Sequence, residues 1–331
     1  MEQENKTSNK IQNIILIIMI IITIIILSIT ITLCAIFTKE KHPSKNVVKE
    51  PKDFGLKQNN KRVKLNSVNS EYYIPINGIG IYSLDYYTCI NSIETALSKG
   101  VRLIDIDNIY GNKDCVQRAI NYSGISRDEI FIIAKISPDE YSNPGKAIEN
   151  FLNRTNFEYI DLMLLNHPGK NDVKAYLIME EYTKNHTIRS LGLSNWYIKE
   201  LKHFLRKINI IPAIIQNEIH PYYQETDFIN YIYNDLKDKN IIVQGWYPLG
   251  GKGYNSELMQ DEVLINIGKK YHKTLPQVIL RWHLQRGTIV IPGSSNTQHI
   301  IENNDIYDFE LSDEDMKNIA NLNRDEKHGW Y

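Results

Sequence analysis

Short apolar runs alternate with amphipathic stretches along most of the chain. Eight runs rich in Ile, Val and Leu lie at Gly78–Ile81, Val101–Ile106, Ile130–Lys135, Ile160–Asn166, Ser190–Ser194, Ala213–Glu218, Ile241–Trp246 and Ile289–Pro292. Between them, apolar residues recur at helical spacing, as in Thr88–Ser98, Ala175–Lys184, Asp227–Leu236 and Leu275–Gln285. This alternation predicts parallel strands joined by crossover helices.

The length of this part is consistent with one closed fold. Residues 66–331 approach the roughly 250 residues of an eight-fold β/α barrel. A doubly wound sheet is the alternative, but no glycine-rich phosphate-binding fingerprint follows the first run. We predict an α/β fold, a (β/α)8 TIM barrel over residues 66–322, with a C-terminal tail at 323–331. Asn185, after the helix that ends at Lys184, is expected to stop that helix in a left-handed conformation.

A long apolar run precedes the barrel. Ile14–Phe37 has 24 residues and no charge, so as a helix it would be about 36 Å long and would cross a hydrocarbon core of about 30 Å. A cleaved signal peptide has a shorter apolar core and a small-residue cleavage site, and a soluble core helix would have a polar face. We expect a retained single-pass transmembrane helix at 14–37, after a short tail at 1–13.

The charges are unevenly distributed along the chain. The net charge is −1, yet residues 38–65 carry nine Lys and Arg against three acids. This basic linker follows the apolar run, and by the positive-inside rule it predicts that the barrel faces the cytosol. The linker either stays solvated or rests on anionic lipid headgroups. A near-zero net charge argues against nucleic acid as a partner.

The three cysteines lack a recognisable pattern. Cys34 lies in the apolar run, whereas Cys89 and Cys115 lie on predicted helices. An odd number without close spacing predicts neither a disulfide framework nor a metal site. A reducing compartment is the simpler expectation.

Polar residues end most of the predicted strands. In a β/α barrel the chemistry takes place at the C-terminal ends of the strands. Packing does not explain so many polar groups at one end of a barrel. The residues at or just beyond these ends are Asp105, Tyr110, Lys135, Asn166, Ser194, Asn195, Gln216, Glu218, Trp246 and Ser294.

These residues belong to segments that resemble the aldo-keto reductase superfamily, in order and with the family's spacing, over nearly all of 71–322. The segments are IPINGIGIY, GVRLIDIDNIYGN, IFIIAKI, YIDLMLLNHP, IRSLGLSNW, PAIIQNEIHPY, GWYPLG, LPQVILRWHLQRG and IPGSSNTQHIIEN. The resemblance implies NAD(P)H-dependent reduction of a small aldehyde or ketone to an alcohol by hydride transfer.

The resemblance also implies four catalytic positions. Tyr110 would donate the proton, and Lys135 would lower the pKa of this phenol from its usual value of about 10. Asp105 would hold Lys135 charged and in place; a structural ion pair in the barrel mouth is the alternative. Asn166 would orient the carbonyl oxygen through its amide.

Asn166 departs from the family pattern, which has His at this position. The β-subunits of voltage-gated potassium channels resemble this sequence in having Asn there. The alternative function is therefore a weakly active, cofactor-binding regulatory or redox-sensing module that acts through a protein partner; a scaffold with a dead pocket is a third.

Asp107 is a second departure from the family pattern, because another carboxylate would raise the pKa of the tyrosine. Tyr82 and His167 are expected to line the substrate mouth.

The cofactor positions follow from the same resemblance. Ser194, Asn195 and Gln216 would bind the nicotinamide carboxamide, Trp246 would stack on the ring, and the backbone of Leu249 and Gly250 would approach the pyrophosphate. The residues expected around the adenosine end are Ser294, Ser295, Asn296, His299, Glu302 and Asn303. Gly293 and His299 replace the Lys and Arg that usually clamp the 2′-phosphate of NADP. We expect NADPH as the default cofactor, with a weakened preference that allows NADH.

Overall fold

The computed structural model describes residues 23, 47–58, 61–67, 71–106 and 113–327. Two compact units divide the chain, Met1–Lys45 and Asn46–Tyr331, and the second contains the predicted barrel. The predicted transmembrane helix lies outside the described residues except for Thr23, as do Asp107 and Tyr110. Within the described ranges, no helix is both long and apolar enough to cross a bilayer.

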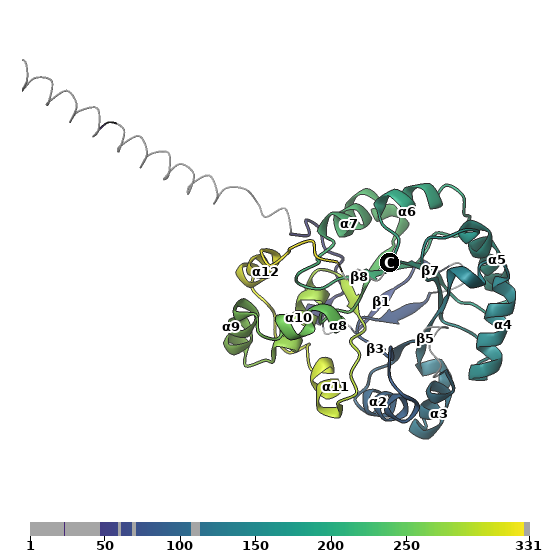
Figure 1. Cartoon of the computed structure of the whole chain (residues 1–331), viewed down its shortest axis with the longest axis horizontal. Helices are drawn as coiled ribbons and strands as arrows, with labels where there is room; N and C mark the ends of the chain where they lie inside the picture. The colour runs from purple at the N-terminus through teal and green to yellow at the C-terminus, as the bar shows by residue number, and fades with distance from the viewer. Residues whose placement is uncertain (1–22, 24–46, 59–60, 68–70, 107–112, 328–331) are drawn as a thin grey trace, which may run out of the picture. The chain divides into compact units, whose positions relative to one another are not determined.

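Eight parallel strands form the centre of the unit in consecutive order (Figure 1). They are β3 (Ile79–Gly80), β4 (Leu103–Asp105), β5 (Phe131–Ile136), β6 (Leu162–Leu165), β7 (Leu191–Ser194), β8 (Ile214–Glu218), β9 (Ile242–Trp246) and β10 (Thr288–Val290). The first and last strands meet, because the backbone N–H of Gly78 donates to the carbonyl of Val290 at 2.9 Å. The predicted eight-stranded α/β barrel is confirmed.

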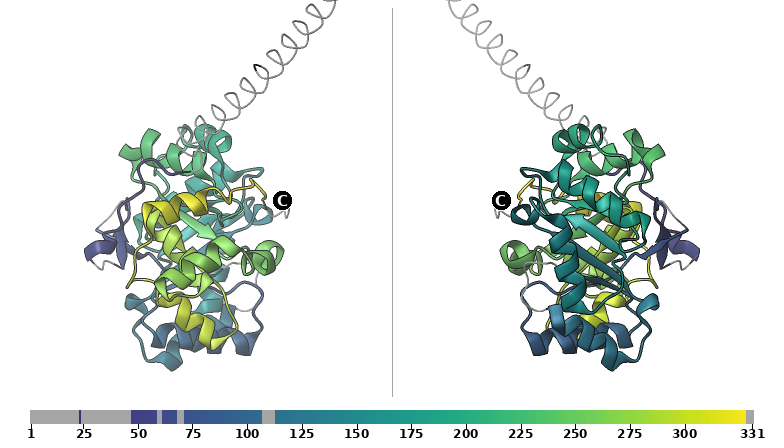
Figure 2. Two further views of the ribbon diagram at one scale, coloured as in Figure 1. Left: turned by 90° about the vertical axis from the view of Figure 1, so that its left-hand side faces the viewer. Right: turned by 90° about the vertical axis from the view of Figure 1, so that its right-hand side faces the viewer.

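Helices surround the strands on the outside (Figures 1 and 2). They are α2 (Tyr86–Ser98), α3 (Lys113–Ser123), α4 (Pro144–Thr155), α5 (Asp172–Lys184), α6 (Ile198–Phe204), α7 (Thr226–Asn230), α8 (Gly251–Leu258), α9 (Glu262–Tyr271), α10 (Leu275–Gln285), α11 (Thr297–Asn304) and α12 (Asp313–Ala320). Shorter helical turns are η1 (Leu56–Gln58), η2 (Arg127–Glu129), η3 (Pro138–Glu140), η4 (Tyr231–Asp235) and η5 (Lys237–Lys239). Local sequence explains some boundaries: α10 begins with a capping box between Thr274 and Gln277.

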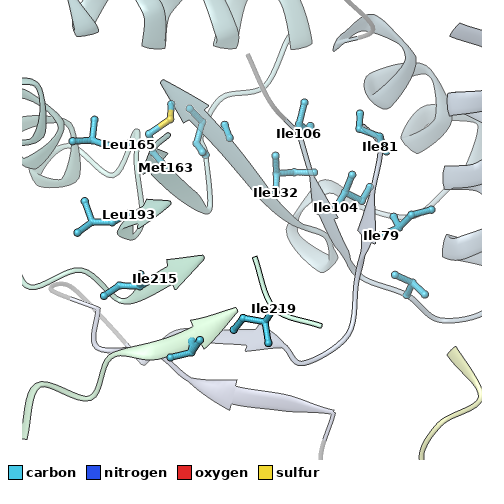
Figure 3. Packing of buried hydrophobic residues seen from close by; sticks show 14 of the residues in the cluster. Ile79, Ile81, Ile104, Ile106, Ile132, Met163, Leu165, Leu193, Ile215 and Ile219 are labelled. Carbon is cyan, nitrogen blue, oxygen red and sulfur yellow. The ribbon is translucent and has the colours of Figure 1, made fainter. Parts of the chain in front are cut away.

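Alternation along each strand divides the core into two clusters. Outward-facing residues such as Ile104, Ile132 and Leu193 join the larger cluster between strands and helices (Figure 3). Their neighbours on the strands, such as Leu103 and Ile133, belong to a second cluster inside the barrel. Because successive strand side chains point to opposite faces, one apolar run serves both clusters.

The second cluster extends beyond the predicted barrel boundary. Strand β1 (Arg62–Lys64) pairs antiparallel with β2 (Tyr73–Pro75), and Phe54, Val63 and Leu65 are buried in this cluster. The compact unit therefore begins at Asn46 rather than at residue 66. The range 38–65, expected to be a linker, contributes buried side chains: Val63 and Leu65 alternate with the exposed Arg62 and Lys64 along β1 and just beyond it.

The predicted elements are found with small changes. Each of the eight apolar runs overlaps one strand, with β5 ending one residue later and β10 beginning one residue earlier than predicted, and the helix Leu275–Gln285 has the predicted bounds. The stretch Asp227–Leu236 divides into α7 and the π-helical turn η4. The prediction for Asn185 was wrong: its φ is −101°, and the left-handed residue is His186, with a φ of 62°. Asn185 instead accepts a hydrogen bond from the backbone N–H of Thr187.

Cys89 and Cys115 form a disulfide between α2 and α3, with their Cα atoms 6.1 Å apart. The expectation of no disulfide was wrong. The two residues are 26 positions apart, and only the packing of α2 against α3 brings them together. Both are fully buried. Because disulfides are typical of oxidising compartments, this bond weighs against the reducing compartment inferred from the cysteine number.

Candidate active site

Strand alternation brings the predicted polar residues to one end of the barrel. Each lies two positions after an inward-facing residue at the C-terminal end of its strand, and each strand pairs in parallel with the next. The set comprises Asp105, Lys135, Asn166, Ser194, Gln216 and Trp246. Glu218 also ends a strand, but it is fully buried with its Oε1 3.2 Å from His220 Nε2, and it does not line the cavity.

A buried ion pair lies at the centre of this end. Lys135 Nζ donates to Asp105 Oδ1 at 2.7 Å, and the two residues are 6% and 5% exposed. The other oxygen of Asp105 accepts a hydrogen bond of 2.7 Å from Gln216 Nε2, which also donates to Gln244 Oε1. The carboxylate therefore has partners on both oxygens, and it fixes the ammonium group at the floor of the site.

Asn195 connects the neighbouring strand ends. Its Oδ1 accepts from the indole Nε1 of Trp246 at 3.1 Å, and its Nδ2 donates to the carbonyl of Asn166 at 2.9 Å. The residue has a φ of 66°, in the left-handed region. Its amide is thus engaged in holding Trp246 and the end of β6, in addition to any contact with a ligand.

His167 lines the site beside Asn166 and is half-buried. Its backbone is fixed by Tyr141, whose hydroxyl donates to the carbonyl of His167 at 2.7 Å. Burial, together with the nearby ammonium groups of Lys135 and Lys327, lowers the pKa of His167 to about 4. The imidazole is therefore neutral near pH 7 and serves as a hydrogen-bonding wall of the cavity.

These residues line a cavity of about 780 Å³, within the size range of small-molecule and cofactor sites. The sequence-predicted residues that line it are Tyr82, Asp105, Lys135, Asn166, His167, Ser194, Asn195, Gln216, Trp246, Leu249, Ser294, His299, Glu302 and Asn303. Gly250, Ser295 and Asn296 do not line it. Tyr110 lies outside the described residues, between Ile106 and α3.

Sequence reasoning missed one wall of the cavity. Tyr247 lines it with a φ of 50°, and its ring lies edge-on to Trp246 and Tyr82 at centroid distances of 4.8 and 5.9 Å. Gly251 is needed beside it, because an added Cβ would come within 2.2 Å of the Tyr247 ring. Lys252 Nζ donates to Ser83 Oγ at 3.1 Å. The two adjacent glycines at 250 and 251 could have indicated a close approach of the backbone, but not to which side chain.

The part of the cavity expected to receive the adenosine end of a cofactor has few donors for a phosphate. Asn296 Oδ1 caps α11 by accepting from the N–H groups of Gln298 and His299, so these donors are already used. Glu302 places a carboxylate in the lining. A side chain at Gly293 would bring its Cβ to 2.8 Å from the carbonyl oxygen of Gly80, so the backbone here does not admit the usual lysine without shifting.

The residues present fit a nicotinamide dinucleotide by the chemistry of their donors. Ser194 and Gln216 offer hydroxyl and amide groups of the kind that match a carboxamide, next to the indole of Trp246. Ser294 and Asn303 offer neutral polar groups at the far end. The arrangement is a polar cavity at the end of the barrel, with the buried Lys135–Asp105 pair in its lining.

The comparison with known proteins gives the family. The sequence pattern of the aldo/keto reductase family matches residues 78–324, and the chain belongs to this family. It is 36% identical over 260 residues to a glyoxal reductase of Bacillus subtilis, covering 77% of this chain and 91% of that protein. It is 32% identical over 261 residues to the methylglyoxal reductase DkgA of Escherichia coli, covering 77% and 92%.

Solved structures agree with this assignment. The crystal structure of an aldo-keto reductase from a deep-sea metagenome library is 32% identical, covers 81% of this chain and 96% of its own, and superimposes with a TM-score of 0.75. The general chemistry of the chain is therefore that of an oxidoreductase of the aldo-keto reductase type, acting on aldehydes or ketones with a nicotinamide cofactor.

Proposed function

We propose that this protein reduces small aldehydes or ketones, 2-oxoaldehydes above all, to alcohols with NADH or NADPH. The observation that carries the proposal is the buried Lys135–Asp105 pair in a cavity lined by Asn166, Gln216 and Trp246. A structural ion pair would not need a cavity of nucleotide size above it. The names of the relatives, a glyoxal reductase and a methylglyoxal reductase, supply the substrate class.

The chemistry requires a hydride on the carbonyl carbon and a proton on its oxygen. The hydride would come from a nicotinamide cofactor held by this site. Tyr110 transfers its hydroxyl proton to the oxygen, and the ammonium of Lys135 stabilises the phenolate that remains. Asp105 keeps Lys135 ionised and fixed. Asn166 donates an amide hydrogen to the same oxygen, and His167, being neutral, contributes no charge to the substrate wall.

The cofactor preference follows from the adenosine end. A 2′-phosphate needs fixed cations, whereas the lining there offers Glu302, His299 and neutral groups. The cap that Asn296 provides to α11 also withdraws two backbone donors. We therefore propose that NADPH loses the advantage it has over NADH in sites with a Lys and an Arg, and that both cofactors support turnover.

The test uses the full chain with methylglyoxal and a nitrobenzaldehyde, following oxidation of NADH and NADPH by absorbance. Tyr110→Phe should lose nearly all turnover while still binding NADH, detected by quenching of Trp246 fluorescence. Turnover that is indifferent to this substitution would sink the proposed role of Tyr110. Absence of turnover in both proteins, with cofactor binding retained, would favour the second candidate.

That second candidate is a weakly active, cofactor-binding regulatory or redox-sensing module, and Asn166 is the residue that favours it. An amide cannot exchange a proton with the substrate as an imidazole can. Asn166→His separates the two functions. Increased turnover in this variant would mean that the native site is tuned down; unchanged or lower turnover would support an enzyme that works with Asn.

We further propose that residues 14–37 anchor the protein in a membrane with the barrel on the cytosolic side, where the buried Cys89–Cys115 bond would be an exception to the usual absence of disulfides from reducing compartments. The proposal rests on the uncharged apolar run and on the lysines that follow it. Protease added from the cytosolic side of intact membranes should cleave between Lys39 and Lys45. Protection of this stretch would mean that the barrel lies on the opposite side of the membrane. That side is an oxidising compartment, where a disulfide such as Cys89–Cys115 is expected.

A further inference from the structure

Helix α6 and the turn after it carry a group of exposed cations. The segment 198–207 reads IKELKHFLRK and holds four Lys or Arg against one acid. Lys199 and Lys202 are three residues apart on α6 and share one side of the helix, and Arg206 and Lys207 follow in the turn after it. We call them the basic face: Lys199, Lys202, Arg206 and Lys207, all exposed.

The charged side chains of the basic face are exposed to solvent. Some surface lysines are paired with carboxylates, as Lys270 is with Asp315 at 2.7 Å. Within the described residues, no carboxylate lies within 4.0 Å of the four cations of the basic face. Lys202 instead lies over the ring of Tyr231, 4.9 Å from its centroid. This differs from the rest of residues 66–331, where acids outnumber bases.

The start of the compact unit lies beside the basic face. The backbone N–H of Lys49 donates to Asn230 Oδ1 at 2.9 Å, one residue before Tyr231. Val48 is buried in the same core as Ile229 and Ile232. The chain that precedes residue 48 therefore leaves the barrel next to η4.

Chain length limits how far this surface can be from the apolar run. Nine residues, 38–46, separate Phe37 from Val47, and the ten Cα-to-Cα steps between these two residues span at most about 35 Å. Three of the nine residues are lysines. If residues 14–37 cross a bilayer, this maximum span limits the distance between the lipid headgroups and the part of the barrel around η4 and α6.

We propose that the basic face docks on the anionic phospholipid surface of the membrane that residues 14–37 enter. Lys and Arg are attracted to anionic headgroups over about a Debye length, and long cationic side chains beside a tyrosine suit the interface between water and lipid. The anchor proposed above brings the surface near; the four cations decide which face of the barrel turns toward the lipid. Docking would hold the barrel in one orientation at the membrane.

The experiment measures hydrogen–deuterium exchange of the full chain with vesicles of phosphatidylcholine alone or with added phosphatidylglycerol. Exchange in peptides covering 198–207 should slow several-fold on the anionic vesicles only, and high salt should restore it. Peptides covering α4 (Pro144–Thr155) should exchange at the same rate on both. Equal exchange of 198–207 on the two vesicle types overturns the proposal.

Matched variants separate the basic face from general charge. Reversal of all four cations, by Lys199→Glu, Lys202→Glu, Arg206→Glu and Lys207→Glu, should abolish the slowing. The same charge change at exposed positions elsewhere on the barrel, by Lys99→Glu, Lys146→Glu, Lys269→Glu and Lys317→Glu, should preserve the slowing. If the control variant also abolishes it, the basic face is not the docking site. Flotation with phosphatidylcholine vesicles tests the anchor separately, since only an inserted apolar run binds neutral lipid.

Discussion

His167 is a histidine whose surroundings keep it uncharged. Its pKa is lowered to about 4 by burial and by Lys135 and Lys327, whereas an unfolded chain has a histidine pKa of about 6.5. As pH falls from 6.5 toward 4, the unfolded state binds a proton that the folded state does not. Stability from this residue is therefore complete above pH 6.5 and decreases as pH falls.

His167→Gln should remove this part of the acid sensitivity. The drop in the urea midpoint between pH 7 and pH 5 should be smaller in the variant than in the parent protein. His203→Gln, at an exposed position on α6, serves as the control and should leave the drop unchanged. An equal drop in all three proteins would show that His167 titrates normally.

Two glycines with left-handed φ separate a backbone effect from a packing effect. Gly251 has a φ of 53° and leaves room for Tyr247, whereas Gly100 has a φ of 85° with nothing within 4 Å of an added Cβ. Gly100→Ala should cost only the backbone strain, about 1 kcal/mol. Gly251→Ala should cost more and weaken NADH binding, because the ring of Tyr247 must move; thermal unfolding and Trp246 quenching measure both. Equal melting temperatures in the two variants contradict this role of Gly251.

At the scale of elements, the disulfide joins the two helices that flank β4. The bond between Cys89 and Cys115 closes a loop across 26 positions, for which loop entropy gives a stabilisation of about 3 kcal/mol. Cys89→Ser should lower the melting temperature under non-reducing conditions, and a reductant should bring the parent protein toward the variant. Cys34→Ser should have no such effect. Peptide mapping without reduction that finds both thiols free would rule out the bond.

The strands and their polar ends could be predicted, because each depends on local pattern. Asp105, Lys135, Asn166 and Gln216 follow apolar runs whose period decides which way they point. The disulfide and the wall at Tyr247 could not, since each depends on which helix or loop packs against which. The role of Asn195 in holding Trp246 is of the same kind. The position of Asn195 in the sequence predicted a contact with the cofactor, but it did not predict the hydrogen bond with Trp246.

At the scale of the whole molecule, the end of the barrel formed by the N-terminal ends of the strands depends on residues before the predicted boundary. Phe54, Val63 and Leu65 are buried against the interior cluster that contains Leu103, Phe131 and Ile289. Burying one such side chain contributes about 2 kcal/mol. The three together approach the lower part of the 5–15 kcal/mol, roughly, that stabilises an ordinary domain. The basic composition of 38–65 concealed this because lysines occupy the exposed positions between them.

A chain of residues 46–331 should therefore fold and melt cooperatively, whereas a chain of residues 66–331 should be largely unfolded or aggregated. Both chains lack the apolar run, so they differ only in residues 46–65. If the first chain is soluble and the second is not, the difference comes from these residues. A matched pair in the full chain avoids truncation: Val63→Ala should lower the urea midpoint, and Val47→Ala, at a position 41% exposed, should leave it nearly unchanged. If residues 66–331 melt at the same temperature as 46–331, the hairpin of β1 and β2 is an appendage, and the barrel is complete at the boundary that composition alone indicates.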